Sequence, residues 1–255
     1  MSVQPVTQRQ RETLSLRFMR RIARLILPFV GKPVTSSILA QMTRRSFPSV
    51  ESLRHEYRLL ATRSFAYHMD IDIPPVDSVP PIRAYEMQDW AKAVNRSLKA
   101  ENEIPEGRTI TRQDVSRVLR RADLHGRNAE RNTMVALSVE SEEVIGWARV
   151  DPIPPTCPLC RLTISRGPVY SSAQAAGSDG NDYHTGCTCE VVPVRSKESW
   201  PGRDQYLKER QLYKEAKGNA KAYRALVKKA NKDAGPGVTQ TTADKLAGLN
   251  EKESH

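Results

Sequence analysis

CPLC at residues 157–160 and HTGCTC at residues 184–189 are the two stretches that decide the fold expected for this chain. They supply a C-x2-C pair, Cys157 and Cys160, and an H-x2-C pair, His184 and Cys187, with Cys189 two positions further on. Each pair has the spacing at which one tight turn presents two ligands to a tetrahedral ion, and thiolates with one imidazole suit zinc. We therefore predict a structural Zn²⁺ site held by four of these five residues.

Other interpretations of the cysteines stay open. All four cysteines lie between Cys157 and Cys189, so they can also be reduced thiols or local disulfides that close a loop. A catalytic zinc site is disfavoured, because the nearby ligands are needed to close the site and no general base is evident. A nuclease of the HNH type is disfavoured because it would need His184, which the metal takes. We accordingly expect no enzymatic activity and no small-molecule substrate.

The motifs lie between two expected strands, residues 144–150 and 189–194, of which the second is rich in valine. Most of the remaining chain has apolar residues at helical spacing. The expected helices cover residues 14–27, about 49–68, 90–98, 111–122, 129–137 and 203–232, with Gly126 bending or breaking the chain between two of them. The fold class is therefore α+β, mostly helical with a small zinc-stapled, β-containing C-terminal domain.

The expected domain organisation follows composition. Four prolines between residues 70 and 81 favour a stiff, extended linker. The predicted parts are a basic helical docking segment (1–69), this Pro-rich linker (70–81), a helical plus zinc-knuckle domain (82–200), a charged helix (201–234) and a disordered tail (235–255). The first segment is too short to bury a core of its own in this scheme, so we expect its apolar stripe to need a partner surface.

Positive charge is concentrated at the two ends of the chain. The 255 residues include 40 Lys and Arg against 29 Asp and Glu, a net charge of +11. Residues 1–65 carry 12 basic and 3 acidic side chains and residues 195–255 carry 14 and 8, whereas residues 66–194 carry 14 and 18. Such a balance favours polyanionic partners. Four arginines on one helix face either contact phosphates or an acidic protein, or form a solvated face: Arg17, Arg20, Arg21 and Arg24.

A family resemblance is carried by four motifs in order. They are GWARV at 146–150, CPLC at 157–160, RGPVY at 166–170 and YHTGCTC at 183–189. In order and spacing over residues 127–194 they resemble the C-terminal signature of MuF-type minor head proteins of tailed bacteriophages, in the version found in phages of actinobacteria. Thr185 and Thr188 stand where the broad family often has a proline and an arginine, so any charged contact of that arginine is not expected here.

The resemblance implies a low-copy structural virion protein that is incorporated during head assembly in the host cytoplasm. It implies the portal and other head proteins as partners, and nonspecific contact with DNA inside the head. The alternative is a free-standing zinc-ribbon regulator that binds nucleic acid with some sequence preference. No apolar run reaches the length of a membrane span, so we expect no membrane partner.

Overall fold

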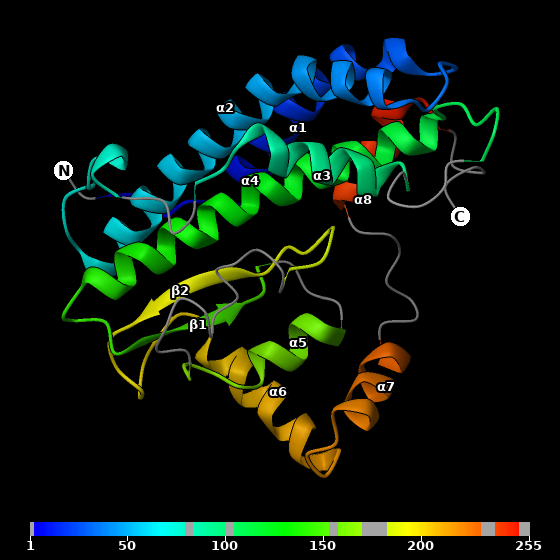
Figure 1. Cartoon of the computed structure of the whole chain (residues 1–255). Coiled ribbons are helices and arrows are strands. Elements are labelled where there is room, and N and C mark those ends of the chain that lie inside the picture. Colours follow the sequence, from blue (N-terminus) through cyan, green and yellow to red (C-terminus); the bar gives the residue numbers. More distant parts are fainter. Residues whose placement is uncertain are drawn as a thin grey trace. The chain divides into compact units, whose positions relative to one another are not determined.

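The computed structural model describes residues 3–79, 84–99, 105–152, 158–169, 183–230 and 238–249. Within them the chain is mostly helical and has one small two-stranded sheet, as the predicted α+β class requires (Figure 1). The helices and strands are α1 Gln8–Ile26, α2 Ser36–Met69, α3 Met87–Ser97, α4 Arg112–Glu140, β1 Gly146–Val150, α5 Pro158–Ile164, β2 Glu190–Val194, α6 Arg203–Glu215, α7 Ala220–Ala230 and α8 Val238–Ala247.

The chain divides into two compact units that interleave along the sequence. The helical unit comprises Thr7–Tyr57, Arg83–Ala129 and Pro236–His255, whereas the sheet unit comprises Met1–Val6, Arg58–Ile82 and Glu130–Gly235. The division falls inside α2 and inside α4, so each of these long helices contributes residues to both units. The predicted segment 1–69 is likewise shared between the units.

Helix α1 of the helical unit begins at a capping box. The Thr7 hydroxyl accepts a hydrogen bond from the Gln10 backbone N–H at 3.2 Å, and the Gln10 side chain accepts one from the Thr7 backbone N–H at 2.7 Å. The apolar stripe of α1 is buried: Leu14, Phe18, Met19, Ile22, Ala23 and Ile26. The expectation that this stripe is exposed and needs an external partner is therefore wrong, and four of its residues, Met19, Ile22, Ala23 and Ile26, share one core with residues of α2, α3, α4 and α8.

Helix α2 starts earlier than the sequence predicts. It begins at Ser36 rather than near Ser49, and it continues through Pro48, which has no N–H to donate to the preceding turn. The flanking Phe47 and Val50 are both buried in the core of the helical unit. Burial of these side chains on either side of the proline offsets the missing hydrogen bond.

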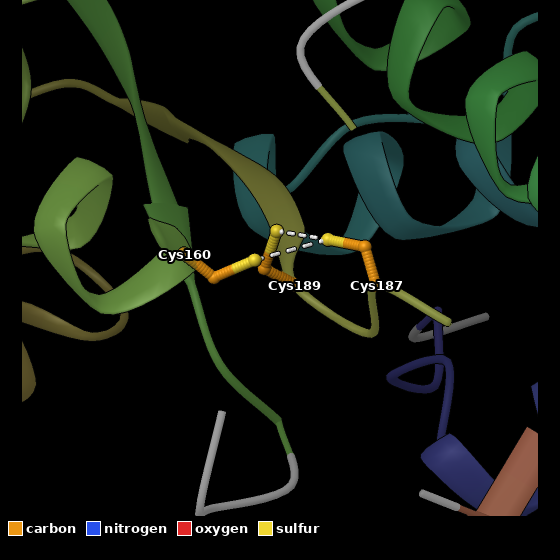
Figure 2. Close-up of side chains that lie close together, drawn as sticks. All are labelled: Cys160, Cys187 and Cys189. Carbon is orange, nitrogen blue, oxygen red and sulfur yellow. Dashed lines mark hydrogen bonds between the residues drawn. The ribbon is translucent and has the colours of Figure 1, made fainter. Parts of the chain in front are cut away.

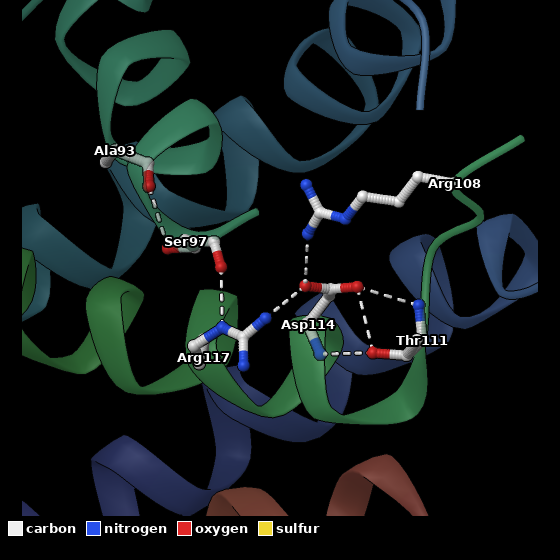
Figure 3. Close-up of polar contacts among 6 residues, drawn as sticks. All are labelled: Ala93, Ser97, Arg108, Thr111, Asp114 and Arg117. Carbon is white, nitrogen blue, oxygen red and sulfur yellow. Dashed lines mark hydrogen bonds and ion pairs between the residues drawn. The ribbon is translucent and has the colours of Figure 1, made fainter. Parts of the chain in front are cut away.

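Helix α4 opens at a capping box formed by Thr111 and Asp114, which is part of a larger polar cluster (Figure 3). The buried Asp114 carboxylate accepts hydrogen bonds from the Thr111 N–H at 2.8 Å and the Thr111 hydroxyl at 2.9 Å. It also pairs with the guanidinium groups of Arg108 and Arg117, and Arg117 donates to the Ser97 carbonyl at 2.7 Å. The start of α4 is thereby fixed to the preceding loop and to the end of α3.

Of the bend or break predicted at Gly126, the break does not occur, since α4 runs without interruption to Glu140. A Cβ atom at residue 126 would lie 2.6 Å from the Tyr57 ring and 2.9 Å from Leu53 on α2. The glycine therefore serves the close approach of these two helices. Its position inside α4 costs about 1 kcal/mol of helix propensity relative to alanine, which this contact offsets.

Part of the tail expected to be disordered forms helix α8. Ala243 and Ala247 are fully buried in the core of the helical unit. Ser116 donates a hydrogen bond to the Asp244 carboxylate, and Arg112 donates to the Ala247 carbonyl at 2.9 Å. Small side chains at helical spacing give α8 a narrow buried face, which composition alone did not reveal.

The sheet unit is built on the antiparallel pair β1–β2, which confirms both predicted strands. Gly146 lies opposite Val194 and Val150 lies opposite Glu190. Pro193 is accepted because, in a pair of strands, each strand is an edge. Ala148, Val192 and Val194 pack with Trp200 in a small core. The 39 residues between the strands, 151–189, contain α5 and the cysteine and histidine motifs.

The single charged helix predicted over residues 203–232 is two helices, α6 and α7. Lys217 and Gly218 have positive φ angles of 54° and 69°, which end α6. The Asn219 side chain then caps α7 by accepting hydrogen bonds from the N–H groups of Lys221 and Ala222 at 2.9 and 3.0 Å. The break lets Tyr223 and Val227 of α7 pack with Leu162 of α5.

The described part of the Pro-rich linker is packed rather than fully extended. Residues Val76–Ser78 form a 3₁₀ turn, and the side chains of Val76 and Val79 are buried. Arg58 of α2 donates hydrogen bonds to the carbonyls of Val76 at 2.9 Å and Val79 at 2.6 Å. Pro80 and Pro81 lie outside the described residues.

None of the helices within the described ranges combines the length and the apolar character that crossing a bilayer requires.

Candidate metal centre

Three buried thiols from the two predicted motifs meet in the sheet unit (Figure 2). The Cys187 sulfur lies 3.3 Å from that of Cys160 and 2.9 Å from that of Cys189, and all three sulfurs lie within 4.8 Å of one another. Cys160 is on α5, while Cys187 and Cys189 come directly before β2. The three cysteines are free thiols in the structure.

His184 brings an imidazole nitrogen to the same place. Its Nε2 atom lies 3.2 Å from the Cys160 sulfur. Its Nδ1 atom lies 3.0 Å from the Thr185 carbonyl oxygen, where an N–H can donate. With the proton on Nδ1, the lone pair of Nε2 faces the thiols, which is the tautomer that binds a metal ion through Nε2.

The turn between His184 and Cys187 depends on Gly186. The Cys187 N–H donates to the His184 carbonyl at 3.0 Å, and Gly186 inside this turn has a φ of +83°. A Cβ at residue 186 would meet nothing within 4 Å, so the glycine is needed for its backbone angle and not for space. Gly186 therefore permits the turn that brings His184 and Cys187 toward the same place.

Arg131 of α4 holds the loop that carries two of the thiols. Its guanidinium donates to the Cys189 carbonyl at 2.9 Å and to the Cys187 carbonyl at 2.8 Å. Arg131 is 3% exposed, so these bonds are shielded from water. The arginine therefore fixes the backbone of both cysteines while leaving their sulfur atoms available to a ligand.

The ring of Tyr183, the residue before His184, contacts the guanidinium groups of two arginines. The guanidinium carbons of Arg131 and Arg149 lie 4.0 and 4.2 Å from the centre of the Tyr183 ring. Burial raises the pKa of the Tyr183 phenol, so this side chain stays neutral. Two buried positive charges thus accompany the cysteines, a setting that compensates negative charge on thiolates.

The three thiols do not lose their protons equally: against the lowering effect of the Cys160 hydrogen bond, the Cys187 hydrogen bond and burial raise the pKa of Cys189, whereas the pKa of Cys187 is lowered. Hydrogen bonds from Cys160 and then Cys189 lower the pKa of the Cys187 thiol well below its usual range, against the opposing effect of burial. The thiolate is the form that binds metals. Cys187 is therefore the first of the three to present a ligand in its binding form.

The donor set matches the chemistry of a structural zinc site. Ligand sulfurs about 2.3 Å from a tetrahedral ion lie about 3.8 Å apart, so the separations of 3.3 and 2.9 Å would have to widen by less than about 1 Å to hold one ion. Among the described residues, the three cysteines are the group with ligand atoms mutually within 4.8 Å, and His184 lies beside Cys160; addition of its imidazole would complete four-coordination and leave no position for a substrate. The cluster of cysteines can hold a metal ion, and its closed, buried form suits a structural role.

The structure brings together Cys160, His184, Cys187 and Cys189 of the five predicted ligands. Cys157 lies outside the described residues, so its part in the site stays a prediction. Cys187 and Cys189 are two positions apart, and their sulfurs lie 2.9 Å from each other. Two aromatic side chains of the quoted motifs, Tyr183 and Trp147, are buried in the sheet unit, and Tyr170 is outside the described residues.

Arg131 and Arg149 are absent from the set of residues that the sequence singles out. Arginines are usually exposed, and nothing in the local pattern marks these two as buried. One signal was present: Arg149 lies within the predicted strand 144–150, and in the structure Trp147, Ala148 and Arg149 itself are all buried. A charged residue within a strand buried on both faces indicates a nearby polar or charged partner.

Comparison with known proteins places the chain among phage gene products. A profile described as VG15 protein matches residues 77–242, more than half of the chain. The "Gene 15 protein" of Mycobacterium phage L5 is 37% identical over 112 residues, which cover 30% of this chain and 38% of that protein. The "Gene 15 protein" of Mycobacterium phage D29 is 35% identical over 100 residues, covering 29% and 36%.

The matched region spans less than two fifths of the length of these two relatives. No solved structure matches this chain.

Proposed function

The chain belongs to the VG15 protein family, whose members include phage gene products, and from this premise we propose that it is a structural minor head protein of a tailed bacteriophage. The observation that carries the proposal is the assembled cluster of Cys160, His184 and the two cysteines before β2. These residues belong to the motifs that resemble the MuF-type signature, and they lie inside the region matched by the family profile.

In this proposal the metal is zinc, and its role is to stabilise the sheet unit by cross-linking α5 to the segment before β2. Cys160, His184, Cys187 and Cys189 would hold the ion, linking α5 to the strand that follows Cys189. The ion would supply folding free energy rather than chemistry, because four protein ligands leave no open coordination position. We accordingly assign no enzymatic activity to the chain.

The partners in this proposal are the portal protein and other head proteins, with nonspecific contact with packaged DNA. The protein would join the head during assembly in the host cytoplasm and remain inside the virion. The excess of positive charge in residues 1–65 and 195–255 supports contact with an anionic partner. Because the apolar stripe of α1 is buried, any docking contact of this helix uses its polar surface rather than that stripe.

The proposal is tested by following the protein into phage particles. Tagged wild-type chain and two variants, Cys160→Ser and Lys208→Gln, are supplied during infection by a phage whose own copy is deleted, and purified particles are assayed by quantitative mass spectrometry. Lys208 is exposed on α6 and serves as the matched control in the same unit. We expect to find the wild type and the control in particles. The amount of Cys160→Ser in particles should be strongly reduced, because the sheet unit loses the zinc ion that stabilises it.

Absence of the wild-type chain from particles would refute the head role. The alternative is a zinc-ribbon regulator, which the combination of a cysteine-rich centre with a net charge of +11 favours. A regulator would be absent from particles and would bind one short duplex sequence much more tightly than a scrambled duplex of the same length.

A further inference from the structure

One face of α1 in the helical unit carries a concentrated positive charge. The arginines at positions 17, 20, 21 and 24 are exposed, whereas the apolar residues between them are buried. This division follows from helical periodicity, since residues three and four positions apart share a face. The core fixes the rotation of the helix, so the four arginines stay on the same exposed face.

The four arginines line a surface groove of about 750 Å³ between α1 and α2. Thr13 and Ser52 add hydroxyl groups to its wall, and Glu56 is its only acidic lining residue among those described. Glu56 pairs with Arg17 at 3.5 Å in an exposed ion pair. Within the described residues, Arg20, Arg21 and Arg24 have no ion-pair partner, so the groove keeps a net positive charge.

We propose that this groove binds the sugar-phosphate backbone of duplex DNA. Arginine matches phosphate well, because its planar fork donates two parallel hydrogen bonds and keeps its charge at every physiological pH. Arg17 and Arg24 are seven residues apart, which is about 10 Å along a helix, and this length corresponds to about three nucleotide steps of one strand. One helix face can therefore meet several successive phosphates.

The lining favours a phosphate backbone over other anionic partners. Stacking of single-stranded bases needs an exposed aromatic ring, whereas Phe18, the aromatic residue of the groove, is 6% exposed. An acidic protein surface would normally add an apolar anchor at the centre of the interface, and Leu16 in this groove is half-buried. The binding is sequence-blind, since phosphate contacts carry no base information.

This inference gives a location to the DNA contact in the proposed function, but it does not depend on a role in the phage head. It is tested with the purified full-length chain and a fluorescent duplex of about 20 base pairs, by anisotropy at several salt concentrations. The variant replaces Arg20, Arg21 and Arg24 by Gln. The control replaces Lys208, Lys214 and Lys221 by Gln, three exposed residues of the sheet unit, so that both proteins lose the same charge.

We expect the arginine variant to bind on the order of a hundredfold more weakly at about 0.15 M salt, with a salt slope smaller by about 2.7, because three phosphate contacts are lost. The lysine control keeps most of the affinity and slope. A third variant, with lysine at the same three positions, keeps the charge and should bind more tightly than the glutamine variant. Circular dichroism spectra and melting temperatures confirm that all variants are folded.

Equal affinities and slopes for the arginine variant and the lysine control would overturn the proposal, because the binding would then follow net charge alone. Polyglutamate that competes with the duplex at equal charge concentration would also overturn it, in favour of an acidic protein partner. Failure of either kind leaves the head role untouched, since that role is measured in particles.

Discussion

The two units bury their side chains by different means. The core of the helical unit includes 21 buried apolar residues from five helices and the segments between them, with Trp90 and Ile22 among those fully enclosed. The sheet unit also buries apolar side chains at the ends of α2 and α4, such as Phe65 and Met134, but the cluster on the sheet itself is small: Ala148, Val192, Val194 and Trp200. The sheet unit instead gathers three thiols and an imidazole.

The difference indicates where each unit obtains its stability. A large apolar core supports a fold by burial, at roughly 25 cal/mol per Å² of apolar surface. Small cores, such as the cluster on the sheet, usually need a disulfide or a metal ion in addition. We therefore expect the helical unit to keep its structure without metal, and β1, α5 and β2 of the sheet unit to depend on it.

Loss of a metal ligand should have the largest effect. Cys160→Ser, Cys187→Ser and Cys189→Ser are each expected to abolish zinc binding and to unfold much of the sheet unit, since metal binding in small zinc modules is worth about 10 to 16 kcal/mol. The spacing of Cys187 and Cys189 alone suggests that they can replace each other. Because both sulfurs lie in the cluster together, we instead expect equal damage, measured as zinc per chain by elemental analysis.

Cys157→Ser is the control for this comparison. The four described ligands are enough for a tetrahedral site, so this variant should keep one zinc per chain. Loss of zinc from Cys157→Ser together with retention by Cys189→Ser would contradict the ligand set and restore the expectation drawn from the spacing.

Substitution of Arg131, which binds the backbone of Cys187 and Cys189, should have a moderate effect on zinc affinity. Arg131→Met keeps the length of the side chain but loses the hydrogen bonds to the carbonyls of Cys187 and Cys189. Mutation of a residue that hydrogen-bonds to metal ligands typically lowers the metal affinity by about 10- to 100-fold. We expect such a loss in a competition titration with a zinc chelator, with partial recovery in Arg131→Lys. Unchanged affinity in Arg131→Met would remove the positioning role.

The helical unit should respond to pH through His125. Burial, with added repulsion from Arg54 and Arg121, lowers the pKa of this imidazole to about 3. The unfolded chain therefore takes up the proton first, so this contribution to stability is complete above about pH 6.5 and is lost as the pH falls toward 3. Between about pH 7.5 and pH 5 the loss is about 2 kcal/mol.

The measurement is urea unfolding at these two pH values for the wild type and His125→Phe, whose ring suits the contacts with Tyr85 and Trp90. The pH dependence of the variant should be smaller by the stated amount. Identical pH dependence in both proteins would show that His125 is already accessible to protons in the folded chain.

Substitution of the glycine between α2 and α4 should have the smallest effect. Gly126→Ala places a Cβ 2.6 Å from the Tyr57 ring. Overpacking costs about 1 to 3 kcal/mol and the better helix propensity of alanine returns about 1, so we expect a net loss of about 1 kcal/mol. In a Tyr57→Leu background the same change should cost less. A stabilising Gly126→Ala in the wild-type chain would contradict the close packing.

Features that depend on neighbours in the chain are predictable from the sequence. They are the capping box at Thr111, the strands β1 and β2, and the candidate ligands His184, Cys187 and Cys189 that lie close to Cys160. A metal site follows from spacing because the turns that present two ligands are short. For this reason the two motifs were enough to predict the cluster.

The predictions that were wrong concern features that depend on contacts between residues distant in sequence. Continuation of α2 through Pro48, the unbroken α4 at Gly126 and the burial of the α1 stripe all come from packing between helices, which periodicity does not specify. The break after α6 was different, because Gly218 followed by Asn219 is a local stop and cap signal that the prediction overlooked.

Hydrogen exchange measured by mass spectrometry tests most directly whether the metal site supports one unit and not the other, which is the central claim. The full chain is compared with and without a zinc chelator under reducing conditions. We predict that backbone protection collapses in β1, α5 and β2, while α1, α3 and α8 keep theirs. Unchanged protection in β1 and β2 after verified removal of all metal would contradict the claim.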